Sequence, residues 1–253
     1  MTPSLAICSM VRNESNGIEE WINHYLVRGV SHFFIIDDDS DDGCYEILKK
    51  HEKLGYLTVV RPQLLRNSQH RPNRQNIAYN KFIKPLIKDY DWLAVLDADE
   101  FLWDSGGFSL PDYLSDIPEE ISIISVPMSD FGDNGLIDQP TSIVNSFTRR
   151  AENIKNPMSG HVKSICRVSN LLSIHMHVST VSGNSIMDKD RLKLNHYKLQ
   201  SLNRWINLVI PRGSANHTRA GEGRHTERYF RSSSKRMNAV EDLGLIVQNN
   251  QML

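Results

Sequence analysis

The sequence contains little cysteine and no long apolar run. Its three cysteines, Cys8, Cys44 and Cys166, are odd in number and widely spaced, which argues against a disulfide framework and favours free thiols in a reducing compartment. No apolar run approaches the roughly 20 residues that a membrane-spanning helix needs. The first ten residues also lack the basic start and apolar core of a signal peptide. We therefore expect a cytoplasmic protein without a membrane span.

Neither sign of charge prevails, and two common glycine motifs are missing. The net charge is −1 and the isoelectric point is near 6.8, so no nucleic-acid partner is expected. The absence of Gly-X-X-X-X-Gly-Lys-Ser/Thr argues against a P-loop nucleotidase, and the absence of Gly-X-Gly-X-X-Gly after the first predicted strand argues against a dinucleotide enzyme. A phosphate site in this chain would have to be built from other residues.

The first hundred residues alternate between apolar runs and helical periodicity. Strands are predicted at 5–11, 33–36, 57–60 and 92–96, and helices at 18–26, 45–55 and 75–88. Pro85 is expected to bend or interrupt the last helix. Apolar runs without polar alternation are typical of buried parallel strands, and their connection through helices implies right-handed crossovers. The fold class predicted is α/β with a mostly parallel central sheet.

The second half of the chain shows another pattern. Strands are predicted at 121–126, 142–148, 161–168 and 173–178, and one helix at 199–210. With no long helices between them, these strands are expected to form a mixed or antiparallel half. The tail beyond Arg212 is rich in Arg, Ser, Gly and His, and is expected to be a helical or partly mobile cover over the site. We predict one domain over residues 1–213 and an extension over 214–253.

The motif Asp97-Ala98-Asp99-Glu100 directly follows the apolar run at 92–96. In open α/β sheets, ligands bind just outside the carboxyl ends of such strands. Two carboxylates at positions i and i+2 can both reach one Mg²⁺ or Mn²⁺ ion, which leaves positions open for phosphate oxygens. The alternative is a solvated strand end, but the buried run before the motif and the apolar 101–103 after it favour a metal site.

A second acidic run, Asp37-Asp38-Asp39, follows the apolar run at 33–36, and Asp41 and Asp42 come soon after it. One of these carboxylates could accept hydrogen bonds from a ribose or a nucleobase. The alternative is a charged turn that caps the next helix, and the residues by themselves leave both open. A calcium loop is not indicated, because the ligand Glu twelve residues on and the flanking helices are missing.

Histidines and basic residues later in the chain supply further candidates. His175 and His177 would point to the same face if they lie on a strand, and together with His196 they could bind a metal ion. The alternative for each of them is a buried core position, which is the more common place for a single histidine in an apolar strand. No cysteine pair supports a zinc site. The basic residues that could neutralise a diphosphate are Arg71, Arg74, Lys163, Arg212 and Arg219.

Several segments, taken in order, resemble GT-A glycosyltransferases of the family 2-like and family 92-like groups. The opening segments are Ile7 to Glu14, Glu20-Trp21, His24-Tyr25, Gly29-Val30, Phe34 to Asp38 with Ser40 and Asp42-Gly43, and Asp91 to Phe101. The later ones are Phe131-Gly132 with Gly135, His161 to Ser164, Asn195 to Tyr197 and Arg212-Gly213. The resemblance covers about residues 4–213. The chain is also similar, less closely, to glycosyltransferases of large algal viruses that decorate capsid protein, which would act in a host cytoplasm.

The resemblance implies a GT-A fold, a nucleotide-sugar donor (usually a UDP-sugar), Mn²⁺ or Mg²⁺, and a hydroxyl acceptor on a glycan or glycoprotein. It implies that Asp99 is the main metal ligand, that Asp97 contacts the ribose or the ion, and that His177 or His196 completes the metal shell. The residues implied at the donor are Met10, Val11, Arg12, Asp38, Arg71, Asp97, Ala98 and Lys163.

The resemblance also implies hexosyl transfer with inversion, as in glycoprotein biosynthesis. Inverting members use a carboxylate as the general base, but the usual Glu-Asp pair has no clean counterpart in this sequence. Asp130 and Asp133 are the candidates for that base.

Two other functions are compatible with the motif. Phosphatases and phosphomutases of the haloacid dehalogenase type also place Asp-X-Asp after an apolar strand, but near the start of the chain and followed by Thr or Val, whereas here Glu100 follows at mid-chain. The other function is a nucleotide-sugar-binding module that has lost turnover. Phosphorylation of Asp97 would indicate the former, and donor binding without transfer or hydrolysis would indicate the latter.

The donor class can be tested by ligand-induced stabilisation. We expect one nucleoside diphosphate, or its sugar, to raise the unfolding temperature selectively in the presence of Mn²⁺, because a ligand of the folded state stabilises it by RT ln(1 + [L]/Kd). The measurement is a thermal-shift panel of nucleoside diphosphates and their sugars with and without Mn²⁺. Equal shifts for all nucleotides, or none, would contradict the expectation.

Overall fold

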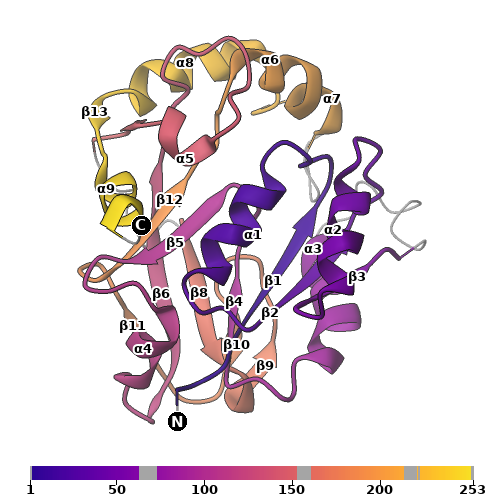
Figure 1. Cartoon of the computed structure of the whole chain (residues 1–253), viewed down its shortest axis with the longest axis vertical. Helices are drawn as coiled ribbons and strands as arrows, with labels where there is room; N and C mark the ends of the chain where they lie inside the picture. The colour runs from indigo at the N-terminus through magenta and orange to yellow at the C-terminus, as the bar shows by residue number, and fades with distance from the viewer. Residues whose placement is uncertain (1, 63–72, 153–160, 214–220, 222, 252–253) are drawn as a thin grey trace.

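The computed structural model describes residues 2–62, 73–152, 161–213, 221 and 223–251 (Figure 1). The strands are β1 Leu5–Val11, β2 His32–Asp37, β3 Leu57–Val60, β4 Trp92–Val95, β5 Glu100–Asp104, β6 Ile121–Asp130, β7 Arg149–Arg150, β8 Val162–Arg167, β9 Leu171–Ser173, β10 Thr180–Val181, β11 Asn184–Met187, β12 Leu192–His196 and β13 Val240–Glu241. The α-helices are α1 Ile18–Leu26, α2 Cys44–Lys53, α3 Arg74–Ala78, α4 Leu110–Ser115, α5 Ile143–Ser146, α6 Leu202–Arg204, α7 Ile210–Arg212, α8 Glu227–Met237 and α9 Gly244–Gln251. The π-helical segments are η2 Tyr79–Ile83 and η6 Trp205–Val209, and the 3₁₀ segments are η3 Lys84–Leu86 and η5 Val168–Asn170.

One sheet organises the molecule, with the strand order β3-β2-β1-β4-β8-β6-β12-β5 and β11 added beside β6. The strands β3, β2, β1 and β4 run parallel to one another. β8 is antiparallel to both β4 and β6, and β12 is parallel to β6 but antiparallel to β5. The prediction of an α/β fold with a mostly parallel sheet and a mixed second half is confirmed.

Helices cover both faces of the parallel part, because alternate residues of each strand point to opposite faces. In β2, Phe33 and Ile35 join the cluster that contains Trp21 of α1. Phe34 and Ile36 join the cluster that contains Tyr79 of η2. Figure 1 shows α1 in front of the sheet, beside β1. Because apolar layers bury both faces, these strands carry almost no polar residues until they end.

The predicted strand at 142–148 is wrong, because Ile143–Ser146 forms the short helix α5. The Ser142 hydroxyl caps this helix by accepting from Asn145 N at 3.2 Å. The Glu20 carboxylate, on α1, accepts from the backbone N–H of Ile143 at 2.6 Å and of Val144 at 3.1 Å. A carboxylate from the first twenty residues thus satisfies the helix N-terminus, which local propensity could not reveal.

The predicted strand at 173–178 is also mostly wrong, since β9 ends at Ser173. Asparagine side chains replace the strand ladder beyond that point. Asn80 Oδ1 accepts from Ile174 N at 3.0 Å, and Asn76 Oδ1 accepts from Met176 N at 2.9 Å. The predicted helix at 75–88 is divided into α3, η2 and η3, with Pro85 in the last. The strands β5, β11 and β12 were not predicted.

The C-terminal part folds back over the core. Leu245 of α9 belongs to the main apolar cluster, and β13 pairs with β7. The buried Arg28 guanidinium, on the turn after α1, donates to Gln248 Oε1 at 3.1 Å and Asn249 Oδ1 at 2.7 Å. These contacts favour one unit that includes α8 and α9, and the boundary at residue 213 stays a prediction. No helix in the described part of the chain has the length and apolar character needed to cross a bilayer.

A buried histidine makes stability depend on pH. His24 lies within α1, and its Nε2 is 2.8 Å from the Leu102 carbonyl oxygen. Burial, with a smaller contribution from Arg28, lowers the pKa of His24 well below 6.5. The unfolded chain binds a proton at His24 below about pH 6.5 while the folded chain does not, so acid favours unfolding there.

We therefore expect the stability of the protein to fall as the pH decreases from 7.5 to 5.5, and to fall less in His24→Gln. Urea unfolding at a series of pH values measures the free energy of unfolding directly. The other histidines are shared by both proteins, so the difference between the two pH profiles reports His24. Parallel profiles would show that His24 does not contribute.

Candidate functional site

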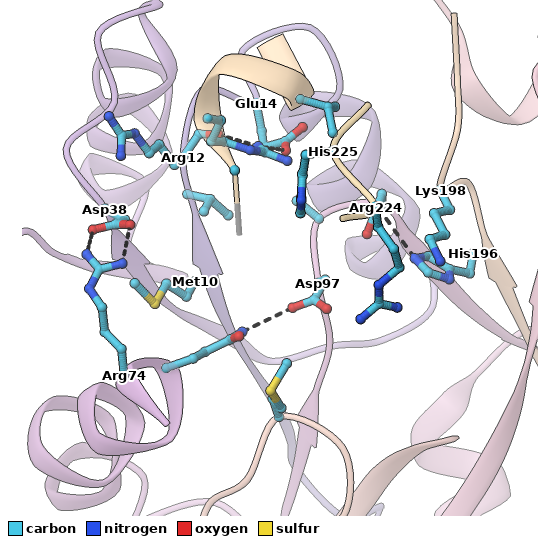
Figure 2. A pocket seen from close by; sticks show the side chains of 18 of the residues that line it. Met10, Arg12, Glu14, Asp38, Arg74, Asp97, His196, Lys198, Arg224 and His225 are labelled. Atoms are coloured by element: carbon cyan, nitrogen blue, oxygen red, sulfur yellow. Dashed lines mark hydrogen bonds and ion pairs between the residues drawn. The ribbon is translucent and has the colours of Figure 1, made fainter. Parts of the chain in front are cut away.

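A cavity of about 510 Å³ lies at the carboxyl ends of β1 and β4. One wall comes from the end of β1 and the loop after it, and the floor comes from the turn after β4. A further wall, which adjoins the loop after β1, comes from the segment that follows β12, through α6, η6 and α7. Side chains from segments far apart in the sequence meet in this space, including Met10, Asp97, His196 and Arg224 (Figure 2).

The acidic motif forms the turn between β4 and β5. β4 ends at Val95 and β5 begins at Glu100, so Asp97, Ala98 and Asp99 line the cavity while Glu100 is buried beneath them. The backbone fixes this turn, since Tyr197 N donates to Asp99 O at 2.8 Å. The two aspartates therefore lie at the sheet edge where ligands of open α/β sheets bind.

A buried ammonium group neutralises one side of this turn. Lys163, on β8, is 2% exposed, and its Nζ lies 2.8 Å from Asp97 Oδ2 and 3.0 Å from Glu100 Oε2. The other oxygen of Asp97 accepts from Gln75 Nε2 at 3.2 Å. Burial alone would lower the pKa of Lys163, but the two carboxylates outweigh it and raise that pKa. Both Asp97 oxygens are thus engaged by protein donors.

Asp99 has a different partner. His196, the last residue of β12, lies with Nε2 3.6 Å from Asp99 Oδ2 and Nδ1 2.9 Å from Asp130 Oδ1. Burial opposes charge on both side chains. His196 nevertheless lowers the pKa of Asp99 to about 2, and Asp99 and Asp130 raise the pKa of His196 to about 10.

Among the described residues, Asp99, Glu100 and His196 form a group that could hold a metal ion, with ligand atoms within 4.8 Å of one another. Carboxylate and imidazole ligands suit Mn²⁺ better than Mg²⁺, which prefers oxygen alone. Glu100 is already paired with Lys163, and burial raises its pKa to about 7 despite that pairing. Asp99 and His196 are therefore the two residues of the group that are not paired with the Lys163 ammonium.

The other late histidines lie elsewhere. His177 lines the cavity, but it is outside this group, and burial together with Lys163 lowers its pKa. His175 Nδ1 is 3.2 Å from Asn76 Nδ2. Of the two histidines predicted to bind metal, only His196 lies beside Asp99 in the part of the chain that the structure describes.

The predicted nucleoside residues lie at the other end of the cavity. Met10, Val11, Arg12 and Asp38 all line it. Both amino groups of Arg74 donate hydrogen bonds to the Asp38 carboxylate (Figure 2): Nη1 lies 2.7 Å from Oδ2, and Nη2 donates to Oδ1. Arg71 lies outside the described residues.

Neighbouring acidic residues after β2 serve the backbone. Asp42 Oδ1 accepts from Cys44 N at the start of α2, and its Oδ2 accepts from Ser15 N at 2.8 Å. Asp41 Oδ1 accepts from Asn13 Nδ2 at 2.8 Å. Asp42 therefore contacts the start of the next helix, as the turn alternative expects, and both residues tie that turn to the loop after β1.

The two candidate bases do not line the cavity. Asp130, 3% exposed, contacts His196. Asp133, 4% exposed, accepts from Asn238 Nδ2 at 2.7 Å. A role as base therefore stays a prediction for both.

Several cavity residues were not predicted from the sequence: Glu14, Gln75, Met176, Lys198, Arg204, Trp205, Arg224 and His225. Glu14 belongs to the Arg12-Asn13-Glu14 segment of the resemblance, so a signal existed for it. Arg224 and His225 belong to the tail that was expected to cover the site, but Lys198, Arg204 and Trp205 carry no local signal, because they reach the cavity only when the C-terminal part folds back.

The ion pair of Lys163 generates a stability prediction. Lys163→Met keeps the aliphatic stem but leaves Asp97 and Glu100 close together without the ammonium, so we expect the free energy of unfolding to fall by about 3 kcal/mol at pH 8. The loss should shrink at pH 5, where a carboxyl can take up a proton. Urea unfolding measures both values, with the exposed Lys88→Met as the matched control. A loss no larger than that of the control would contradict the role given to Lys163.

Comparisons with solved structures find a distant likeness. The S. aureus TarS fragment 1–349 matches with a TM-score of 0.48 and 14% identity, over 75% of this chain and 60% of that chain. The same fragment in complex with UDP matches with a TM-score of 0.48 and 14% identity, over 76% and 60%.

Comparisons with curated sequences find relatives in plants. A glycosyltransferase family 92 protein of Oryza sativa subsp. japonica is 25% identical over 206 residues, 78% of this chain and 33% of that protein. One of Ricinus communis is 25% identical over 215 residues, 84% of this chain and 34% of that protein. The chain spans about a third of the length of these relatives. The model of Glycosyltransferase family 92 matches residues 4–238. The chain therefore belongs to glycosyltransferase family 92.

Proposed function

We propose that this protein is a metal-dependent glycosyltransferase that moves a sugar from a nucleoside diphosphate sugar, with UDP as the favoured nucleotide, to a hydroxyl of a glycan or glycoprotein. The observation that carries the proposal is the Asp99–His196 pair at the carboxyl end of the sheet, facing arginines across one cavity. Family membership supports sugar transfer over the phosphatase alternative.

Asp99 and His196 would hold the divalent ion. Asp130 accepts from His196 Nδ1 in this assignment, which leaves Nε2 for the metal, as carboxylates commonly do for ligating histidines. When bound, the ion supplies positive charge to the leaving diphosphate. We assign Asp130 the role of positioning His196. We assign Asp97, which is paired with Lys163, to donor binding rather than to direct coordination of the metal ion.

The nucleoside would lie between the end of β1 and Asp38. Both amino groups of Arg74 hold Asp38, so the carboxylate is fixed in place, and further lone pairs on its oxygens remain to accept hydrogen bonds. A carboxylate acceptor fits the N3–H of uracil, and it would also accept from the exocyclic amino group of cytosine. The preference for a uridine donor in this proposal therefore rests on the family resemblance.

Transfer itself requires that the donor be held with its anomeric carbon exposed to the acceptor. The acceptor oxygen would form a bond to the anomeric carbon as the bond from that carbon to the diphosphate oxygen breaks, and the hydroxyl proton would pass to a base. The arginines opposite Asp99 would hold the diphosphate, which leaves with the bonding electrons and gains negative charge. Among the described cavity residues, Glu14, Asp38 and Asp97 are each paired with a cationic side chain. The hexose, the acceptor and the inverting outcome expected from the resemblance belong to this proposal.

The metal assignment is tested by Asp99→Ala. We expect metal-dependent turnover to fall at least about 100-fold, because loss of the ion removes several kcal/mol of stabilisation of the leaving diphosphate. The measurement is release of UDP from a panel of UDP-sugars over a Mn²⁺ titration, with circular dichroism as a check of the fold. The matched control is Asp89→Ala, an exposed carboxylate remote from the cavity lining. Normal turnover that still requires metal in Asp99→Ala would overturn the assignment.

A further inference from the structure

Glu14, in the loop after β1, binds two arginines from the C-terminal part of the chain. Arg204 Nη2 donates to Glu14 Oε2 at 2.5 Å, and Arg212 Nη1 donates to Glu14 Oε1 at 2.6 Å. Arg212 Nη1 also lies 2.7 Å from the Arg12 carbonyl oxygen. The Glu14 side chain is 14% exposed and that of Arg204 is 6% exposed. One carboxylate therefore aligns two guanidinium groups that come from different helical segments.

The loop that carries Glu14 is itself held firmly. Asn13 adopts a left-handed conformation with φ of 57°, which asparagine tolerates better than most residues. Its backbone N–H donates to Ser40 Oγ at 2.9 Å, and its side-chain oxygen accepts from Asp41 N at 2.9 Å. Because the loop is tied to the turn after β2, the Glu14 carboxylate is a fixed point rather than a mobile surface charge.

Both arginines face the acidic turn across the cavity. Arg204 and Arg212 line the same cavity as Asp97 and Asp99. Burial raises the pKa of Asp99, whereas His196 and then Arg204 lower it. Burial lowers the pKa of Arg212, but Glu14 foremost, and then Asp99 and Asp97, raise it overall. The two guanidinium groups are thus close enough to the acidic turn to interact electrostatically with its carboxylates.

The two guanidiniums keep hydrogen-bonding capacity. A guanidinium carries five N–H donors, and the hydrogen bonds given above engage one amino group on each arginine, Nη2 of Arg204 and Nη1 of Arg212. Arg224 and His225 line the cavity beside them. Figure 2 shows Arg224 directed into the same space as Asp97. This side of the cavity is cationic and can receive a polyanion.

We propose that Glu14 is a positioning residue for the diphosphate: it holds Arg204 and Arg212 as a pair that binds the phosphate groups opposite Asp99. The identity of the donor rests on the proposed function, but the clamp itself requires only a diphosphate. Arginine binds phosphate through its planar fork, so its orientation matters as well as its charge. Fixing two long side chains in advance lowers the entropy lost on binding.

This role is distinguishable from that of an ordinary surface ion pair. Glu14 brings negative charge to a site proposed to bind anions. If charge alone mattered, Glu14→Gln would bind pyrophosphate more tightly, because one opposing charge is gone. If Glu14 acts by orienting the arginines, the same change weakens binding. The two accounts therefore predict opposite signs.

The test is calorimetric titration of the full chain with inorganic pyrophosphate, UDP and uridine. We expect Glu14→Gln to weaken pyrophosphate and UDP binding about tenfold, equivalent to about 1.4 kcal/mol, and to change uridine binding less than twofold. The control is Glu46→Gln, an exposed carboxylate on α2, which should leave all three affinities unchanged. Glu14→Asp, which keeps the charge on a shorter side chain, should lie between Glu14→Gln and the wild type.

A double-mutant cycle separates positioning from a general loss of structure. In an Arg204→Ala, Arg212→Ala background, adding Glu14→Gln should weaken pyrophosphate binding no further, because the residue acts through those arginines. An equal additional loss in that background would overturn the proposal, as would unchanged or tighter binding in Glu14→Gln alone.

The outcome also separates this proposal from the proposed function. Glu14-dependent binding of pyrophosphate, without sugar transfer or nucleotide selectivity, would support the clamp and refute the glycosyltransferase assignment. Sugar transfer with the same donor KM in Glu14→Gln and the wild type would support the enzyme and refute the clamp. No binding of pyrophosphate or UDP by the wild type would refute both.

Discussion

A buried ammonium ion makes the acidic turn possible. Three carboxylates lie within four consecutive positions, Asp97 to Glu100, and burial of such a group without a cation would be costly. Lys163 reaches two of them from the neighbouring strand β8, at 2.8 Å and 3.0 Å. It neutralises the side of the turn that faces the core and leaves Asp99 directed to the cavity. The chemistry proposed for Asp99 therefore depends on a lysine that is 66 residues from Asp97 in the sequence.

The same principle operates on the other side of the cavity. Glu14 and Arg204 are separated by 190 residues, and Glu14 and Arg212 by 198. They meet because the chain after β12 returns over the carboxyl ends of the first strands; α6, α7 and α8 lie together at the top of Figure 1. The cavity thus has an acidic floor supplied by the sheet and a cationic wall supplied mainly by the returning chain. A divalent ion and a diphosphate together would match this distribution of charge.

Part of the fold could be predicted because burial leaves a mark on sequence. The strands β1, β2 and β4 are covered on both faces, so they appear as mostly apolar runs, and carboxylates marked the ends of β2 and β4. β5 was missed because it begins with Glu100, which resembles a loop residue until Lys163 is placed beside it. Residues 142–148 were taken for a strand because Ile143 and Val144 favour that state locally. Glu20 decided otherwise by capping α5.

The sequence alone determined the α/β class, the acidic turn as the focus of the candidate site, and the resemblance that family membership then confirmed. It could do so because apolar periodicity and a carboxylate pair after a buried run are local properties, which depend only on residues that are close together in the sequence. Only the tertiary structure decided which carboxylates are neutralised, which late histidine meets Asp99, and which arginines enter the cavity. Those outcomes depend on distances between segments that are far apart in the chain, and such distances exist only once the core has packed.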